Sequence, residues 1–320
     1  MEYQEFIQSI TNRIQAILGD QYQVVCHPVC KNNGVYLDGL IITSKETNIS
    51  PSIYLNQYYD QFVLGRPMSE IVWEIFQLFK KAPQIGNMDI DQFADFSKVK
   101  ENIAIKLINY DANREMLSDV PHRRFLDLAI VYYFVVPNEL LGNATILIRN
   151  DHVSLWQTNE RTLYRIGMRN TLFLGWEIRP MNVIIRDYLE EELDDYLKER
   201  NPDRQIEPDR IQQLAEEILA DIYDGDDEGP LYVLSNHRRF FGASCMLFTD
   251  RLKAFADLKG SDLYILPSSI HEVILIPQDL SPEYEALCRM VREINDSEVD
   301  ACDRLSDRVY RFDRKTGKIS

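Results

Sequence analysis

The chain has 320 residues, 45% of them hydrophobic, with 13 Gly and 13 Pro, which is typical of a globular protein of roughly two domains. Its formal net charge of −16 argues against sequence-independent binding to nucleic acid or an anionic membrane, because both are bound by clustered Lys and Arg. No apolar run approaches the ~20 residues of a membrane helix, and no leader pattern follows Met1, so we expect a cytoplasmic protein. The five cysteines are scattered along the chain, so we expect no disulfides.

The chain opens with a pattern that predicts a helix followed by a β-hairpin. Helical spacing of apolar residues from Tyr3 to Ile17, followed by Gly19, predicts an amphipathic helix over residues 2–18. The β-rich runs Tyr22–Cys30 and Val35–Thr43 are joined through Asn33-Gly34, a pair that readily takes the positive φ angles of a tight turn. We therefore expect these two runs to form a hairpin.

A third strand and a second helix complete the predicted N-terminal module. Residues 49–55 form another β-rich run, in which Pro51 favours a position at a sheet edge. Ser69 is a candidate cap for a helix in which Ile71, Ile75, Leu78 and Phe79 share one face. The pattern predicts an α-β-β-β-α module over residues 1–88.

The remaining residues, 89–320, predict a larger region of mixed strands and helices. The expected strand regions are 101–110, 125–136, 142–156, 231–236, 243–248, 262–267, 272–277 and 308–312. The expected helices are 159–169, 181–200, one that opens at Pro208, 250–258 and 283–294. Short connections favour mostly antiparallel sheets and an α+β fold class. A Pro-His corner before an apolar run occurs at Pro121-His122 and again between Pro267 and His271, which leaves open that this region consists of two related halves.

Several motifs together resemble a known family. They are NNGVYLDGLII with NISPSIYLN, LINYDANREMLSDVPHRRFLDLAIVYY, GSDLYILPSSIHEVILIP, MVREIN and LSDRVYRFDRKTGKI. The chain resembles an uncharacterised bacterial family, catalogued as a domain of unknown function and met mainly in Gram-positive gut anaerobes. The resemblance covers nearly the whole chain and implies no established reaction, cofactor or partner.

The hexapeptide Pro267–Glu272, PSSIHE, is the first candidate site. In an extended chain, Ser269 and His271 would project to one face, as a nucleophile and a base require. The alternative is a structural turn in which the serine hydroxyls bond the backbone and His271 shields a sheet edge.

The second candidate is PHRRFLD, residues 121–127. His122, Arg123, Arg124 and Asp127 combine a potential base with two arginines that are suited to a carboxylate or phosphate. The alternative is that these arginines pair with carboxylates of the chain itself.

No metal or cofactor site is expected. The acidic turn 224–229 begins like a calcium loop, but its twelfth position is Ser235, where a bidentate glutamate is required. Cys26, His27 and Cys30 are interrupted by Pro28 and lack a second ligand cluster. The chain contains no glycine-rich phosphate loop of known pattern.

Three hypotheses on function remain. The first is a non-enzymatic interaction or regulatory protein of the bacterial cytosol, suggested by the acidic stretches 190–195 and 216–228. The second is a hydrolase-type enzyme using His271 with Ser269, or His122 with Arg123. The third is an acidic mimic of nucleic acid, against which the interspersed Lys and Arg argue. We expect an unknown protein partner and neither nucleic acid nor membrane as a ligand.

Overall fold

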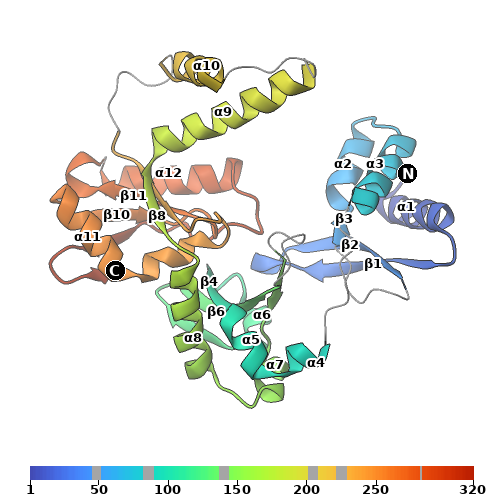
Figure 1. Cartoon of the computed structure of the whole chain (residues 1–320), viewed down its shortest axis with the longest axis horizontal. Helices are drawn as coiled ribbons and strands as arrows, with labels where there is room; N and C mark the ends of the chain where they lie inside the picture. The colour runs from blue at the N-terminus through green and yellow to red at the C-terminus, as the bar shows by residue number, and fades with distance from the viewer. Residues whose placement is uncertain (45–51, 82–89, 137–143, 201–207, 221–228, 282) are drawn as a thin grey trace. The chain divides into compact units, whose positions relative to one another are not determined.

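The computed structural model describes residues 1–44, 52–81, 90–136, 144–200, 208–220, 229–281 and 283–320. These residues form two compact units: Met1–Asn170 with Ala301–Asp303, and Thr171–Asp300 with Arg304–Ser320. Within the described residues, unit 1 contains two antiparallel sheets and unit 2 contains one (Figure 1). Among the described residues, no helix combines the length and apolar character needed to cross a membrane.

The first sheet of unit 1 is the predicted hairpin with a third strand at its edge. Strands β1 (Tyr22–Cys30) and β2 (Tyr36–Ser44) pair along their full length, from Tyr22 opposite Ser44 to Cys30 opposite Tyr36. The connecting turn has φ of 60° at Asn33 and 67° at Gly34, as the Asn-Gly pair predicts. Strand β3 (Ser52–Tyr54) pairs with β2 at the edge.

Three helices cover one face of this sheet (Figure 1). They are α1 (Tyr3–Leu18), α2 (Asn56–Val63) and α3 (Met68–Lys81). Phe6, Ile10 and Ile14 of α1 are fully buried, whereas Ile17 is 50% exposed and does not belong to the core. Ser69 does not cap α3, because the helix begins one residue earlier and the carbonyl of Pro67 accepts its first backbone bonds.

The second sheet of unit 1 is built around the apolar strand β6 (Leu128–Val135). Strand β4 (Ile103–Asn109) pairs with one side of β6. Strands β5 (His122–Phe125) and β7 (Thr145–Leu147) pair with successive parts of the other side. The expected strand region 142–156 is therefore wrong over its second half, where helix α7 (Asn150–Leu155) forms.

The second sheet of unit 1 is accompanied by helices and short helical turns. These are α4 (Ile90–Ala94), α5 (Phe96–Val99), η2 (Lys100–Asn102), α6 (Arg114–Leu117), α7 and α8 (Glu160–Phe173). Helix α8 lies close to β4 because Gly167 has no side chain: a Cβ there would stand 2.7 Å from Ile105 Cγ2.

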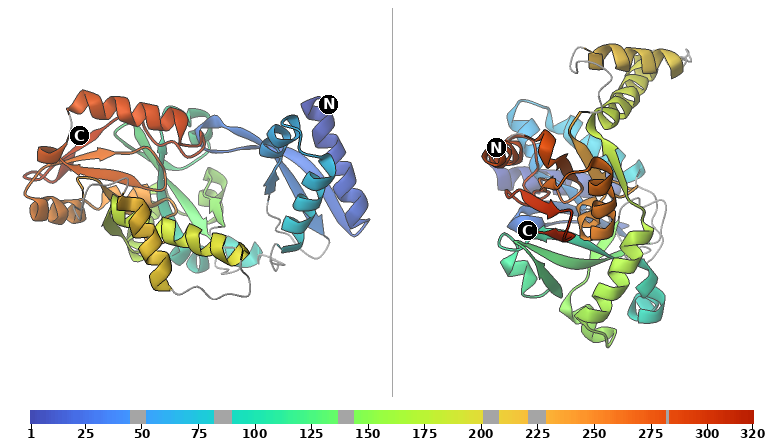
Figure 2. Two further views of the ribbon diagram at one scale, coloured as in Figure 1. Left: turned by 90° about the horizontal axis from the view of Figure 1, so that it is seen from above. Right: turned by 90° about the vertical axis from the view of Figure 1, so that its left-hand side faces the viewer.

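Unit 2 is organised around a six-stranded antiparallel sheet in the order β13-β12-β10-β11-β9-β8. Its strands are β8 (Glu177–Pro180), β9 (Tyr232–Ser235), β10 (Leu263–Leu266), β11 (Val273–Pro277), β12 (Tyr310–Asp313) and β13 (Lys318–Ile319). Helices α12 (Tyr284–Ser297) and α11 (Thr249–Lys259) cover opposite faces of this sheet (Figure 2). Strand β8 leads directly into α9 (Met181–Arg200), which packs against α10 (Pro208–Ala220).

The expected strand over 243–248 is wrong. This segment is the short helix η4 (Gly242–Leu247), in which every residue from Gly242 to Met246 is buried. These residues are buried without the alternation of buried and exposed positions that marks a strand at a sheet surface. Their apolar character alone therefore did not distinguish a strand from a helix.

The predicted α+β fold class with mostly antiparallel sheets is confirmed, including the N-terminal helix followed by three strands. The expected boundary near residue 88 lies outside the described residues, as does the acidic turn up to residue 228.

Candidate functional site

The PSSIHE segment is a corner between β10 and β11 in which the side chains of Ser269 and His271 bond the backbone. The backbone N–H of His271 donates to Ser269 Oγ at 3.0 Å. The Nδ1 atom of His271 accepts from the N–H of Phe241 at 3.3 Å, and its ring stacks on the Phe241 ring with centroids 5.7 Å apart. The structure thus brings Ser269 and His271 close together, with both side chains used as acceptors for main-chain groups.

A second loop, residues 235–242, supports this corner and was not singled out from the sequence. The Ser235 hydroxyl donates to the carbonyl of His271 at 2.8 Å. Gly242 lies so close to the corner that a Cβ there would stand 2.1 Å from Ser235 Oγ and 2.6 Å from the His271 carbonyl oxygen. Phe241 adopts a φ of 57°, which few non-glycine residues tolerate. The two loops therefore form one closely packed structure.

One sequence signal pointed to this loop. The tetrapeptide His-Arg-Arg-Phe occurs at residues 122–125 and again at 237–240. The first copy is strand β5, whereas the second lies in the loop after β9, held by the buried side chain of Asn236. The shared letters therefore adopt two different conformations.

The PHRRFLD segment uses its charged side chains within unit 1. Arg123 donates to both oxygens of the Glu160 carboxylate at 3.1 and 3.0 Å, and its guanidinium lies 3.8 Å from the centre of the Tyr164 ring. Tyr132 donates its hydroxyl proton to the same carboxylate. Burial, followed by the hydrogen bond to Glu160, raises the pKa of Tyr132 well above its usual range. Glu160 thus neutralises Arg123 internally.

The other residues of this segment also bond locally. Arg124 donates to the carbonyl of Leu126 at 3.1 Å and lies over the Tyr110 ring. The His122 ring nitrogen Nδ1 is 2.8 Å from the carbonyl oxygen of Val120. The carbonyl of Asp127 accepts from the N–H of Tyr110 in the turn between β5 and β6. These contacts hold the β5–β6 hairpin together.

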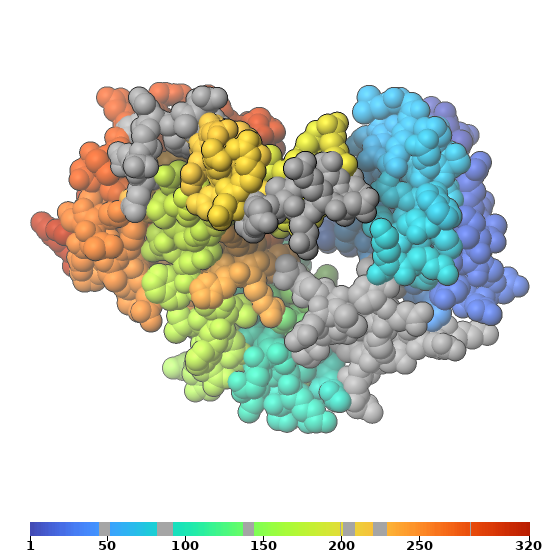
Figure 3. Space-filling view, turned by 45° about the horizontal axis from the view of Figure 1, so that its top comes forward, coloured from blue at the N-terminus to red at the C-terminus, as the bar shows by residue number. Residues whose placement is uncertain are grey.

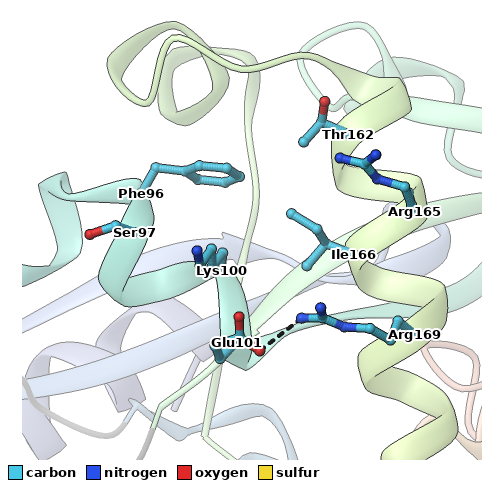
Figure 4. Close-up of a pocket in the computed structure, with 8 residues that line it drawn as sticks. All are labelled: Phe96, Ser97, Lys100, Glu101, Thr162, Arg165, Ile166 and Arg169. Carbon is cyan, nitrogen blue, oxygen red and sulfur yellow. Dashed lines mark hydrogen bonds and ion pairs between the residues drawn. The ribbon is translucent and has the colours of Figure 1, made fainter.

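A pocket that was not predicted from the sequence lies elsewhere in unit 1 and has a volume of about 520 Å³ (Figure 4). Helix α5 and the turn η2 contribute Phe96, Ser97, Lys100 and Glu101. Helix α8 contributes Thr162, Arg165, Ile166 and Arg169. Arg161, Arg165 and Arg169 recur every four residues, which places them on one side of the helix and is the signal that could have found this site.

The described lining of the pocket carries more positive than negative charge, with Lys100, Arg165 and Arg169 against Glu101. Arg169 donates to the Glu101 carboxylate at 2.7 Å, as the dashed line in Figure 4 marks. The Ser97 hydroxyl donates to Asp95 at 2.7 Å, and the backbone N–H of Ser97 bonds the same carboxylate. These two bonds, led by that from the Ser97 hydroxyl, lower the pKa of Asp95. The excess of cationic side chains makes the lining suited to binding an anion.

No part of the described chain groups three or more His, Cys, Asp or Glu side chains as a metal site would require. Cys26 lies in β1 and is partly buried, and burial raises the pKa of its thiol to about 11. The calcium-like turn at residues 224–228 lies outside the described residues.

Comparison with known proteins identifies a family without an assigned role. The model of a family described as of unknown function (DUF5688) matches residues 3–314. No curated protein and no solved structure matches the chain. These comparisons supply no reaction, ligand or partner.

Proposed function

We propose that this chain, which belongs to the family of unknown function DUF5688, is a non-enzymatic interaction protein of the bacterial cytosol. The helical hairpin of α9 and α10, here called the acidic hairpin, carries the proposal. Its partner is a protein that presents a basic, amphipathic surface.

Helix α9 differs from the other long helices described in the chain, because its described side chains are not buried. A helix of its 20 residues spans about 30 Å, yet none of its described side chains is buried. Tyr188 is 60% and Tyr196 51% exposed. In contrast, α12 buries Leu287 and Val291 against the sheet. Apolar and aromatic side chains that the fold leaves accessible are typical of surfaces that bind other proteins.

Charge determines which partner suits this surface. The stretch Met181–Arg200 carries seven carboxylates and three basic residues. Glu191, Glu192 and Asp195 are all exposed. In Figure 3, the gold surface of α10 faces the viewer, and α10 adds exposed Glu216 and Glu217. Complementary charge accelerates encounter and favours a basic partner over an acidic one.

The alternative hypotheses have less support. A nucleic-acid mimic would keep its carboxylates unpaired, whereas Asp194 pairs with Lys198, and Asp187 with Arg179. A hydrolase would need Ser269 and His271 oriented towards a substrate, whereas both bond main-chain groups of the corner. The cytosolic location is supported by the five cysteines, all free thiols, which suit a reducing compartment.

A pull-down from native bacterial lysate at moderate salt tests the proposal. The bait is wild type or a double charge reversal on α9, Glu191→Lys with Asp195→Lys. The control is Glu285→Lys with Glu293→Lys, which changes the net charge equally on exposed positions of α12. We expect one protein to be recovered with wild type and the control, and to be reduced about tenfold with the α9 variant, as loss of about 1.4 kcal/mol implies. Equal recovery with both variants, or no specific recovery with wild type, contradicts the proposal.

A further inference from the structure

We propose that the pocket between α5, η2 and α8 binds a phosphate monoester that carries a flat aromatic group. The pocket lies wholly within unit 1, so this inference is independent of the acidic hairpin. Its volume of about 520 Å³ lies within the ~300–1,000 Å³ usual for small-molecule sites.

The charge of the lining selects the anion. Within the part of the chain that the structure describes, neither Lys100 nor Arg165 forms an ion pair or a side-chain hydrogen bond. Arg169 is neutralised by Glu101, and the Asp95 carboxylate attracts Lys100 without forming an ion pair with it. Lys100 and Arg165 are thus two cations of the lining that no described carboxylate binds directly, in a protein with a net charge of −16. A phosphate monoester carries about −1.5 to −2 charges at neutral pH, which matches two cations better than a single carboxylate does. The forked guanidinium of Arg165 can bind two phosphate oxygens at once.

The remaining lining selects the group attached to the phosphate. Figure 4 shows the Phe96 ring and the Arg165 guanidinium pointing towards each other from α5 and α8, with Ile166 beside them. The Phe96 ring packs against Trp156, with ring centroids 5.8 Å apart. A flat group can stack on an aromatic ring and contact the aliphatic side chain while its phosphate reaches the two cations.

The walls of the pocket are fixed before any ligand binds. The side chain of Asn170 donates to the carbonyls of Lys100 and Ile103, both at 2.8 Å, and so ties α8 to η2. Asp95 caps α5 through Ser97. The close approach of Gly167 to β4 fixes α8 on the sheet. A site that is already formed loses little conformational entropy on binding.

Isothermal titration calorimetry on the full chain tests the proposal, with phenyl phosphate as the probe. Inorganic phosphate tests the anion without the ring, and phenol tests the ring without an anion. Benzoate tests a ring that carries a single negative charge. We expect phenyl phosphate to bind most tightly, and Arg165→Gln and Lys100→Gln each to weaken it about tenfold. Phe96→Leu should weaken phenyl phosphate several-fold and leave inorganic phosphate unchanged.

Arg161→Gln is the matched control, because Arg161 lies one turn earlier on α8 and outside the lining. It should bind phenyl phosphate within about twofold of wild type. Equal weakening by Arg161→Gln and Arg165→Gln would indicate diffuse attraction and overturn the site. The absence of saturable binding by wild type, or unchanged binding by both Arg165→Gln and Lys100→Gln, would also overturn it.

Discussion

Two regions of unit 2 use their polar side chains in opposite ways. At the corner formed by Pro267–Glu272 and residues 235–242, Ser235, Ser269 and His271 all bond main-chain groups. On the acidic hairpin, Tyr188 and Tyr196 remain largely exposed. Residue types that can carry out catalysis thus stabilise the fold at the corner, whereas the exposed side chains of the acidic hairpin form the surface that we propose binds a partner.

The largest expected effect is that of Gly242→Ala at the corner. A Cβ at this position would stand 2.1 Å from Ser235 Oγ and 2.6 Å from both the Asn236 nitrogen and the His271 carbonyl oxygen. Because two of these atoms belong to the backbone, the loops must separate, and we expect a loss of about 3 kcal/mol or more. Chemical denaturation, monitored by tryptophan fluorescence, measures this loss in the free energy of unfolding.

Gly260→Ala is the control, because a Cβ there would meet open space and add only the strain of its positive φ. Equal losses would break the interpretation of the corner as closely packed.

A smaller effect is expected from Ser269→Ala and His271→Ala. Each removes a bond to a main-chain N–H, which costs about 1 kcal/mol, and His271→Ala also loses ring contacts with Phe240 and Phe241. Thermal unfolding should show a decrease of about 2–4 °C for the transition of unit 2.

His27→Ala is the control for this pair, because His27 is exposed on β1. If Ser269→Ala and His271→Ala are both as stable as wild type and respond differently in a substrate screen, the polar side chains of the corner do not serve mainly to stabilise the fold. The hydrolase hypothesis would then lead.

No stability effect is expected from calcium. The turn 224–229 lacks the bidentate glutamate of a calcium loop, since its twelfth position is Ser235. Differential scanning calorimetry with calcium and with a chelator should give the same melting temperature within error. A calcium-dependent rise that disappears in Asp224→Ala would show that the acidic character of unit 2 serves an ion rather than a partner.

The sequence predicted best where local pattern and packing agree. The Asn33-Gly34 turn determines the β1–β2 register, and the helical spacing of Phe6, Ile10 and Ile14 determines the buried face of α1. It predicted least where a contact between distant segments decides the structure. The pocket depends on Gly167 packing against Ile105 and on Asn170 bonding η2, and neither contact leaves a periodic signal.

The N-terminal module over residues 1–88 remains a prediction. Limited proteolysis should cut first between Asn87 and Asp95, because this polar stretch follows a core of helices and strands. Mass spectrometry should then find an accumulating N-terminal fragment. Uniform resistance across this stretch would contradict the boundary.

Site-specific photo-cross-linking shows whether the acidic hairpin binds a protein partner. Benzoylphenylalanine replaces Tyr196 on α9 in one protein and Tyr284 on α12 in another, positions of comparable exposure at 51% and 44%. The free energy of unfolding should change by less than about 0.5 kcal/mol at position 196 and fall by about 1 kcal/mol at position 284, because Tyr284 donates a hydrogen bond to the carbonyl of Val309 at 3.2 Å. We expect a discrete adduct with one basic protein from position 196 and none from position 284. Equal adducts from both positions, or no adduct from position 196, would contradict this expectation.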